Sequence, residues 1–286
     1  MARIYVLGAG TPTPTADRYG SSYVLELHGQ HLMFDCGPAT THKLVKAGLY
    51  PTQISHLFFT HHHFDHDVDY PCFLLTRWDQ SGDQVPDLEV VGPPLTTTFH
   101  HRLMDFSTGA FSHDWIARIN SPSSQRLHVR RGGSLPRRPP AVNIREMVPG
   151  EVYDGPSWSV RTALAEHAQP WLDSLAYRID WDSGSVVVTG DTRPCQSVLE
   201  LAKEADTMLC CCWDDQERML ERGEHGMCGT VQAAEMAQAA GVKRLVLVHV
   251  GPDLSRHPDR EKGITDIKAV YDGEVIFPDE LMSFEV

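Results

Sequence analysis

The run His-His-His-Phe-Asp-His at residues 61–66 constrains this chain more than any other feature. It follows the apolar segment 57–60, which has the character of a buried strand. Imidazole and carboxylate groups are the ligands, other than thiolates, that zinc prefers. On an extended loop His61 and His63 point the same way and can hold one ion, and His62 between them should point away. Asp65 and His66, past the bend, should face a neighbouring space. A polar surface loop rich in histidine is the alternative, and it fits this spacing poorly.

The composition narrows the class of protein. The chain has 286 residues, 41% of them hydrophobic, and a formal charge of −13, which disfavours bulk electrostatic attraction to nucleic acid. Its seven cysteines are odd in number and contain no C-x-x-C pair, so neither a disulfide framework nor a cysteine zinc knuckle is indicated. The first residues lack the apolar core of a signal peptide, and no apolar run approaches the roughly 18 residues of a membrane span. We expect a cytoplasmic protein without a membrane partner.

Short apolar runs alternate with amphipathic segments along the chain, and the pattern favours an α/β fold. The histidine run then lies on a strand-to-helix loop, and residue 249 lies at the end of a buried strand. The two halves predict a four-layer αβ/βα sandwich as a single domain over residues 1–286. Strands are predicted at 4–7, 22–27, 31–34, 57–60, 88–91, 158–165, 175–181, 185–189, 207–211 and 244–248, and helices at 40–47, 95–105, 194–204 and 230–240.

Periodicity fades at about 107–149, where proline, serine, arginine and glycine accumulate. We interpret this segment as an insertion rather than a linker, either a lid or recognition loop or a plain surface excursion. Phe106 directly precedes it and Phe111 and Trp115 lie within it, and these aromatic residues would help to shape a pocket. The basic run 126–138 is either an anion-binding lip or a solvated face.

Further motifs carry a family resemblance. The segments Leu-Gly-Ala-Gly-Thr-Pro at 7–12, Phe-Asp-Cys-Gly at 34–37 and Thr-Gly-Asp-Thr at 189–192, together with the histidine run, resemble the metallo-β-lactamase superfamily and within it the ribonuclease Z-like branch. The matching motifs extend from residue 7 to residue 249. The resemblance implies the metallo-β-lactamase fold and two divalent metal ions, with zinc as the first choice and manganese or iron as alternatives.

The resemblance also implies a complete ligand set. His167, His249 and Asp191 taken singly would pass as structural residues, but together with the histidine run they complete two sites. Asp35 is expected either to accept a hydrogen bond that fixes the histidine loop or to serve only as a turn residue. The implied ligands are His61, His63 and His167 for one metal, Asp65, His66 and His249 for the other, and Asp191 as the bridge.

The resemblance implies hydrolysis by a hydroxide that bridges the metals, since a pair of such ions lowers the pKa of a shared water. Asp65 is expected to help orient that nucleophile. His225 is a candidate general acid for the leaving group, although its spacing from the following helix is longer than in the family, and a surface loop histidine is the alternative.

The substrate is open at this point. Ribonuclease Z proper carries a long arm for transfer RNA between the third histidine and the bridging aspartate, whereas Asp191 follows His167 by only 24 residues here. We therefore expect a small-molecule phosphodiester or related ester as substrate. Lactonase, arylsulfatase or another ring or ester hydrolase activity is the alternative, and transfer-RNA 3′ processing or a non-catalytic metal-binding interaction module is disfavoured. A homodimer is the family-like expectation, and residues 210–212 are expected to be core cysteines rather than thiolate ligands.

Overall fold

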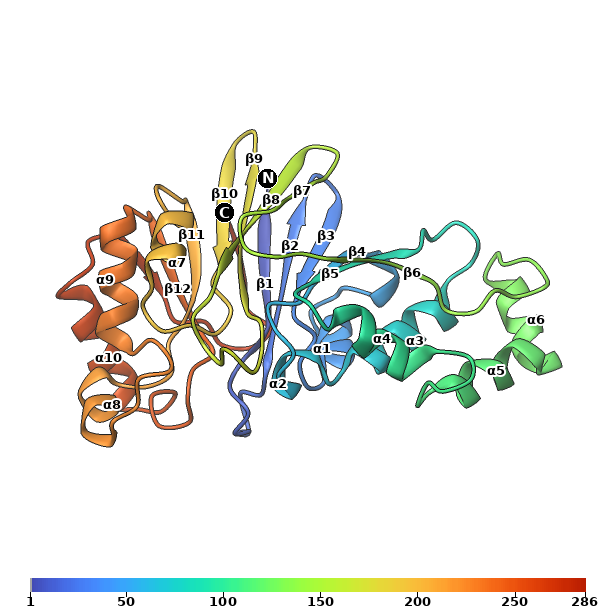
Figure 1. Cartoon of the computed structure of the whole chain (residues 1–286), viewed down its shortest axis with the longest axis horizontal. Coiled ribbons are helices and arrows are strands. Elements are labelled where there is room, and N and C mark those ends of the chain that lie inside the picture. The colour runs from blue at the N-terminus through green and yellow to red at the C-terminus, as the bar shows by residue number, and fades with distance from the viewer. Residues whose placement is uncertain (1) are drawn as a thin grey trace.

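Two seven-stranded sheets form the centre of the molecule in a computed structural model that describes residues 2–286 (Figure 1). In the first sheet, β1 to β3 are antiparallel and β3 to β6 are parallel, and the C-terminal strand β14 pairs antiparallel with β1. Its order is β14 (Ser283–Glu285), β1 (Arg3–Ala9), β2 (Ser21–Leu27), β3 (Gln30–Phe34), β4 (Ile54–Phe58), β5 (Leu88–Gly92) and β6 (Val142–Glu146).

The second sheet repeats this design. Its strands β7 to β10 are antiparallel, and β10 to β13 are parallel. Strands β10, β11 and β12 are buried along almost their whole length, which matches their continuous Val, Leu and Cys sequences and is typical of parallel strands covered on both faces. The order is β13 (Glu274–Ile276), β12 (Arg244–Val248), β11 (Thr207–Cys211), β10 (Gly184–Val188), β9 (Leu175–Trp181), β8 (Trp158–Leu164) and β7 (Val152–Asp154).

Helices cover the outer face of each sheet, so the predicted four-layer sandwich is confirmed (Figure 1). One hydrophobic cluster lies between the sheets, and one lies under the helices of each half. The first half contains α1 (Thr40–Lys46), the 3-10 helix η1 (Pro51–Gln53), α2 (Phe64–Asp67), α3 (Tyr70–Gln80), α4 (Thr96–Met104), α5 (Ser112–Asn120) and α6 (Pro122–Arg130). The second contains α7 (Gln196–Leu201), α8 (Gln216–Arg222), α9 (Thr230–Ala240) and α10 (Asp259–Lys268). None of the helices in residues 2–286 is long and apolar enough to cross a bilayer.

The segment 107–149, for which we predicted no regular structure, contains two helices and a strand. Helices α5 and α6 pack on each other at one end of the molecule, and β6 pairs in parallel with β5 (Figure 1). The proposed helix over 194–204 is shorter, since α7 spans Gln196–Leu201, and the strand proposed at 57–60 begins earlier, at Ile54.

The sheets bring several chain segments to one edge. Residues that follow β3, β4, β10 and β12 leave the carboxyl ends of these strands, where ligands commonly bind in α/β folds. Hydrogen bonds join the halves near this edge. For example, the Leu175 amide donates to the Thr60 carbonyl oxygen at 2.9 Å, and the Tyr177 hydroxyl donates to the Phe59 carbonyl oxygen at 2.7 Å.

Candidate metal centre

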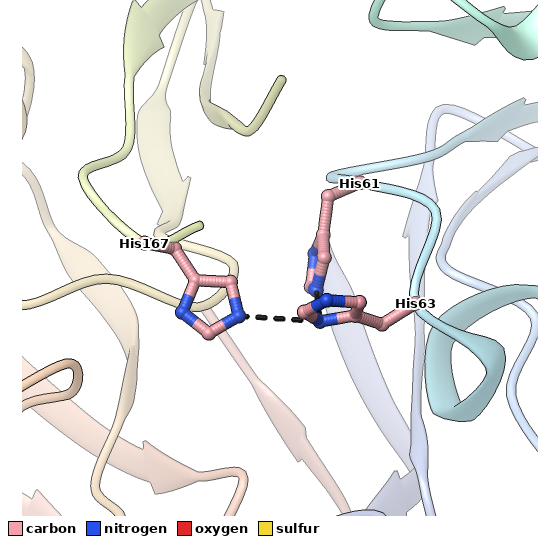
Figure 2. Close-up of side chains that lie close together, drawn as sticks. All are labelled: His61, His63 and His167. Carbon is pink, nitrogen blue, oxygen red and sulfur yellow. Dashed lines mark hydrogen bonds between the residues drawn. The ribbon is translucent and has the colours of Figure 1, made fainter. Parts of the chain in front are cut away.

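Three histidine nitrogens from the two halves of the chain face one another at this edge. His61 Nε2 lies 3.0 Å from His63 Nδ1, and His167 Nε2 lies 3.2 Å from the same His63 nitrogen. Figure 2 shows the three rings converging, with His61 and His63 on the loop after β4 and His167 on the loop after β8. His61 is fully buried, whereas His63 and His167 are partly exposed. Three imidazoles in this arrangement, open on one side, are suited to a catalytic zinc ion.

A second group of donors lies beside the first. His249 Nε2 is 3.2 Å from Asp65 Oδ2 and 3.1 Å from Asp191 Oδ2, and His66 Nε2 is 3.5 Å from both Asp65 Oδ2 and Asp191 Oδ1. Asp191 also lies 3.9 Å from His61 Nε2 and 3.8 Å from His167 Nε2. Asp191 is therefore placed between the two groups, and all seven side chains predicted as metal ligands come together.

Asp35, directly after β3, fixes the histidine loop through hydrogen bonds at both of its ends. Its Oδ1 accepts hydrogen bonds from the Thr60 amide at 2.7 Å and the Thr60 hydroxyl at 3.1 Å, and its Oδ2 lies 2.7 Å from His66 Nδ1. With Nδ1 held in this way, His66 presents Nε2 to the centre. A carboxylate behind a ligating histidine fixes the orientation of its ring and raises its basicity, and Asp35 occupies that position.

The backbone adopts strained conformations around these side chains. Asp35 and His249 have φ of 59° and 51°, and Gly190, directly before Asp191, has φ of 58°. A Cβ atom on Gly37 would lie 2.1 Å from the Asp65 carbonyl oxygen, so only glycine allows the chain after β3 to pass the histidine loop. Positive φ at non-glycine residues is costly and clusters at functional sites.

Burial and neighbouring charges shift the pKa values of the proposed ligands in different directions. Burial lowers the pKa of His61 well below its ordinary value, which keeps the ring neutral and its nitrogen available. Burial would raise the pKa of Asp191, but the neighbouring His249 and His66 outweigh it and hold the pKa well below the ordinary value. The centre therefore combines an ionised carboxylate with imidazoles at close range.

Unpartnered atoms provide a test of whether metal ions fit these residues. His66 Nε2 and Asp191 Oδ1 are buried and have no hydrogen-bond partner among the described residues. A buried polar atom without a hydrogen-bond partner destabilises the folded protein by about 1–3 kcal/mol. A ligand from outside the chain that contacts these two atoms would remove this penalty. A divalent cation is such a ligand and also separates the closely spaced nitrogens, so the residues fit the metals.

His62 points away from the centre, as expected from its place between ligands. Its Nδ1 lies 3.2 Å from Asp67 Oδ2 and its Nε2 lies 2.8 Å from the Thr96 hydroxyl oxygen. Its side chain is only 2% exposed, which indicates a structural role rather than metal binding.

His225 is not part of the ligand groups. It is exposed on the segment between α8 and α9 and lines a cavity of 260 Å³ with Trp213 and Met227. Trp213 in turn stacks on His249, with ring centroids 5.9 Å apart. His225 thus shares a cavity with a residue that contacts the ligand His249, and its role as general acid stays a prediction.

The sequence interpretation missed Thr60, Trp213 and a cavity beside His167. This cavity has a volume of 380 Å³ and is lined by residues that include Glu166, Arg193 and Gly226. Thr60 directly precedes the histidine run, and its position was the available signal. Trp213 carries no such signal, because its contact with His249 joins separate strands of the sheet.

Comparison with known proteins identifies relatives along the whole chain. A family model described as beta-lactamase superfamily domain matches residues 110–250, and one described as anti-Pycsar protein Apyc1 matches residues 2–77. The ribonuclease Z of Mycobacterium avium (strain 104) is 32% identical over 263 residues, which cover 89% of this chain and 88% of that protein. The ribonuclease Z of Mycolicibacterium gilvum (strain PYR-GCK) is 30% identical over 294 residues, and the match covers 100% of this chain and 96% of that protein.

Solved structures share the fold at low sequence identity. The metallo-β-lactamase fold protein YhfI from Bacillus subtilis superposes with a TM-score of 0.74 at 20% identity, covering 100% of this chain and 99% of that one. The short form of human tRNase Z gives 0.71 at 22% identity, with 99% and 98% covered. A diphosphatase of the PhnP family gives 0.67 at 13% identity, with 99% and 96% covered.

Proposed function

The chain belongs to the metallo-β-lactamase superfamily, as a relative of the proteins named ribonuclease Z, and from this premise we propose that it is a phosphodiesterase with two divalent ions, zinc first among them. His61, His63 and His167 would hold one ion, Asp65, His66 and His249 the other, and Asp191 would contact both. The observation that carries the proposal is the convergence of these donors around two buried atoms without partners, His66 Nε2 and Asp191 Oδ1.

The chemistry follows from the residues. Two bound ions would lower the pKa of a coordinated water and offset the negative charge of a phosphodiester. Asp65, held at 3.2 Å from His249, has an oxygen in the centre that can orient the water. His225 would donate a proton to the leaving oxygen, from a segment whose neighbouring residue Gly226 lines the cavity beside His167.

The proposed substrate is a small molecule. The cavity beside His167, at 380 Å³, falls in the range of small-ligand sites. Arg193 lines it, paired with Glu166, and could reach a phosphate oxygen. The interval between His167 and Asp191 is occupied by β9, β10 and short connections, which leaves no room there for an RNA-binding arm.

Transfer-RNA 3′ processing is the second candidate, because the curated relatives carry the name ribonuclease Z. The match to the Mycolicibacterium gilvum protein covers 96% of its length, so this relative also has little additional chain that could form an arm, and the lack of an arm does not by itself exclude this candidate. The net charge of −13 argues against this candidate, since RNA affinity depends heavily on phosphate neutralisation.

Substrate screening distinguishes these functions. The zinc- and manganese-reconstituted protein should hydrolyse bis-p-nitrophenyl phosphate and small phosphodiesters, and His63→Ala should abolish turnover. Lactone or aryl sulfate turnover without phosphodiester turnover would replace the proposal with another esterase activity. Accurate cleavage of precursor transfer RNA would establish the second candidate, and bound metal with no turnover of any substrate class would indicate an interaction module.

A further inference from the structure

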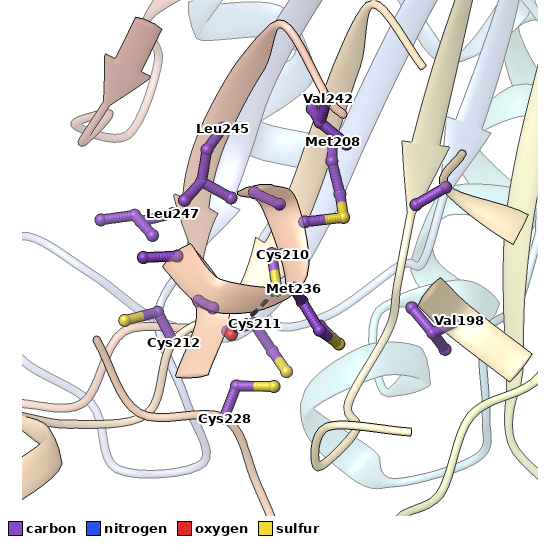
Figure 3. Packing of buried hydrophobic residues seen from close by; sticks show 14 of the residues in the cluster. Val198, Met208, Cys210, Cys211, Cys212, Cys228, Met236, Val242, Leu245 and Leu247 are labelled. Atoms are coloured by element: carbon purple, nitrogen blue, oxygen red, sulfur yellow. Dashed lines mark hydrogen bonds between the residues drawn. The ribbon is translucent and has the colours of Figure 1, made fainter. Parts of the chain in front are cut away.

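Three cysteine thiols converge behind the loop that carries Asp191. Cys210 and Cys211 end β11, and Cys228 lies just before α9. Their sulfur atoms all lie within 4.8 Å of one another. Figure 3 shows Cys211 and Cys228 directed toward each other, with Cys210 close by, whereas Cys212 points away. We call Cys210, Cys211 and Cys228 the thiol cluster.

The thiol cluster is fully enclosed. All three side chains have 0% exposure, and none forms a disulfide bond. Buried cysteines often serve as small apolar residues, but such residues need only contact their neighbours. Here two adjacent residues of one strand and a third residue from a separate loop bring their sulfur atoms to a common point, which is the arrangement of a chelating site.

The chemistry of the cluster selects one class of ligand. The group contains no imidazole or carboxylate from the described residues, in contrast to the nitrogen and oxygen donors of the centre at Asp191. Soft thiolates select soft cations such as Cu(I), whereas structural zinc sites almost always use four protein ligands. We propose that Cys210, Cys211 and Cys228 form a second, separate metal site that binds one soft monovalent cation of the Cu(I) type. The ion would replace thiol protons, which pass to solvent, and no electron transfer is involved.

The segment that carries Cys228 is the part of the chain through which we expect an ion to enter. The segment 223–229 contains three glycines, and its half-buried Glu224 and exposed His225 and Gly226 border the 260 Å³ cavity. Met227, which is 8% exposed, also lines this cavity and directly precedes Cys228. Local opening of this one segment would expose Cys228 without disturbing the sheet.

The cluster is linked directly to the hydrolytic centre. The Cys211 thiol donates to the Thr192 carbonyl oxygen at 3.1 Å, and the Thr192 amide donates to Cys211 Sγ at 3.3 Å. The Cys228 amide also donates to the Thr192 carbonyl oxygen, at 2.9 Å. Deprotonation of Cys211 for ion binding removes one of these bonds beside Asp191. Binding of an ion to the thiol cluster should therefore change the rate of hydrolysis. The bound ion should also give an absorption band of its own.

The test is a titration of the zinc-loaded protein with Cu(I) buffered by a competing chelator. We expect one Cu(I) per chain and a sulfur-to-copper charge-transfer absorption band. Cys228→Ser and Cys210→Ser should each lower the affinity for Cu(I) at least about 100-fold. Replacing a residue that only hydrogen-bonds to a metal ligand usually lowers metal affinity by less than this. Cys72→Ser, which changes an exposed cysteine, should leave the titration unchanged.

A second measurement does not depend on the folding of the variants. Alkylation of the wild-type chain during partial denaturation, mapped by mass spectrometry, should show Cu(I) protecting Cys210, Cys211 and Cys228 but not Cys36 or Cys212. The proposal is overturned if no charge-transfer band forms, if the band survives in well-folded Cys228→Ser, or if all buried cysteines are protected equally. Because the band reports thiolate binding alone, loss of phosphodiesterase activity would not affect this result.

Discussion

Asp35 joins the histidine loop to the end of β3. It accepts two hydrogen bonds from Thr60 and holds His66 Nδ1, all at full burial. Because His66 is a proposed ligand and Thr60 precedes His61, one carboxylate orients both halves of the centre.

Replacing Asp35 by asparagine should therefore weaken metal binding more than it weakens the fold. Asparagine tolerates the φ of 59° at this position, so the substitution removes mainly the charge. We expect a zinc affinity about 10–100-fold lower, measured by competition with a chromogenic chelator, because the carboxylate behind the ligating histidine is lost. Thr60→Ser, which keeps the hydroxyl donor, is the control, and equal zinc affinities for Asp35→Asn and wild type would show that Asp35 has no such role.

His62 and His63 form an internal comparison, since they are neighbours with opposite expected roles. His63→Ala removes the nitrogen that both His61 and His167 face, and the protein should lose one metal ion per chain. His62→Ala removes buried contacts to Asp67 and Thr96, which should cost about 1–3 kcal/mol of stability and leave the metal content unchanged. Elemental analysis and thermal unfolding of both variants measure the two effects, and loss of metal from His62→Ala alone would reverse the assignment.

At the residue scale, the donors of the histidine run at 61–66 could be predicted from their local spacing, whereas His167, Asp191 and His249 were implied by the family resemblance. Histidines two apart on a loop, and a polar residue after a buried strand, are visible without knowledge of the fold. Trp213 and the thiol cluster were not predicted as site features, because their contacts join β11, β12 and the segment before α9, and nothing in the local sequence pairs them.

Among the elements, the turn that ends β10 is tightly constrained. A Cβ atom on Gly190 would lie 2.8 Å from Thr60 Cβ, and its φ of +58° disfavours any side chain. A left-handed conformation costs a non-glycine residue about 1–2 kcal/mol, and Gly190→Ala should lower the free energy of unfolding by more than this because of the added clash. It should also reduce activity, since Asp191 is adjacent. Gly241→Ala, with φ of +68° and open space around the added carbon, is the matched control. Equal losses of stability and activity in both variants, measured by denaturant unfolding and assay, would contradict a close packing requirement at Gly190.

Prediction of the elements succeeded for buried strands and failed for polar helices. Strands β10 to β12 are buried on both faces, so each appears in the sequence as a continuous apolar run that can be recognised without the fold. Helices α5 and α6 are mostly exposed and short, with Trp115 and His128 as their buried residues. Their stability comes from packing on each other and on the first half, which the sequence does not display.

At the scale of the whole molecule, the two sheets enclose a histidine whose pKa differs between the folded and the unfolded chain. His56, on β4, packs among Phe58, Tyr153 and Trp158 between the sheets, and burial lowers its pKa from 6.5 to about 4. The unfolded chain therefore binds more protons than the folded one between these two values.

The stability of the metal-free protein should consequently fall as the pH drops from about 6.5 to about 4 and rise again on return. His100, whose pKa burial also lowers to about 4, acts in the same direction. Urea unfolding as a function of pH measures the slope, and His56→Phe, which packs among the same rings without titrating, should reduce it. A slope that His56→Phe leaves unchanged would assign the acid sensitivity to other groups.

The central claim is that His61, His63, Asp65, His66, His167, Asp191 and His249 together hold two divalent ions. A crystal structure of the zinc-reconstituted protein, with anomalous scattering measured at the zinc absorption edge, tests it most directly. We predict two peaks per chain, one within reach of His61, His63 and His167 and one within reach of Asp65, His66 and His249, with Asp191 contacting both. No peak among these residues at saturating zinc, or peaks only elsewhere on the molecule, would contradict the claim.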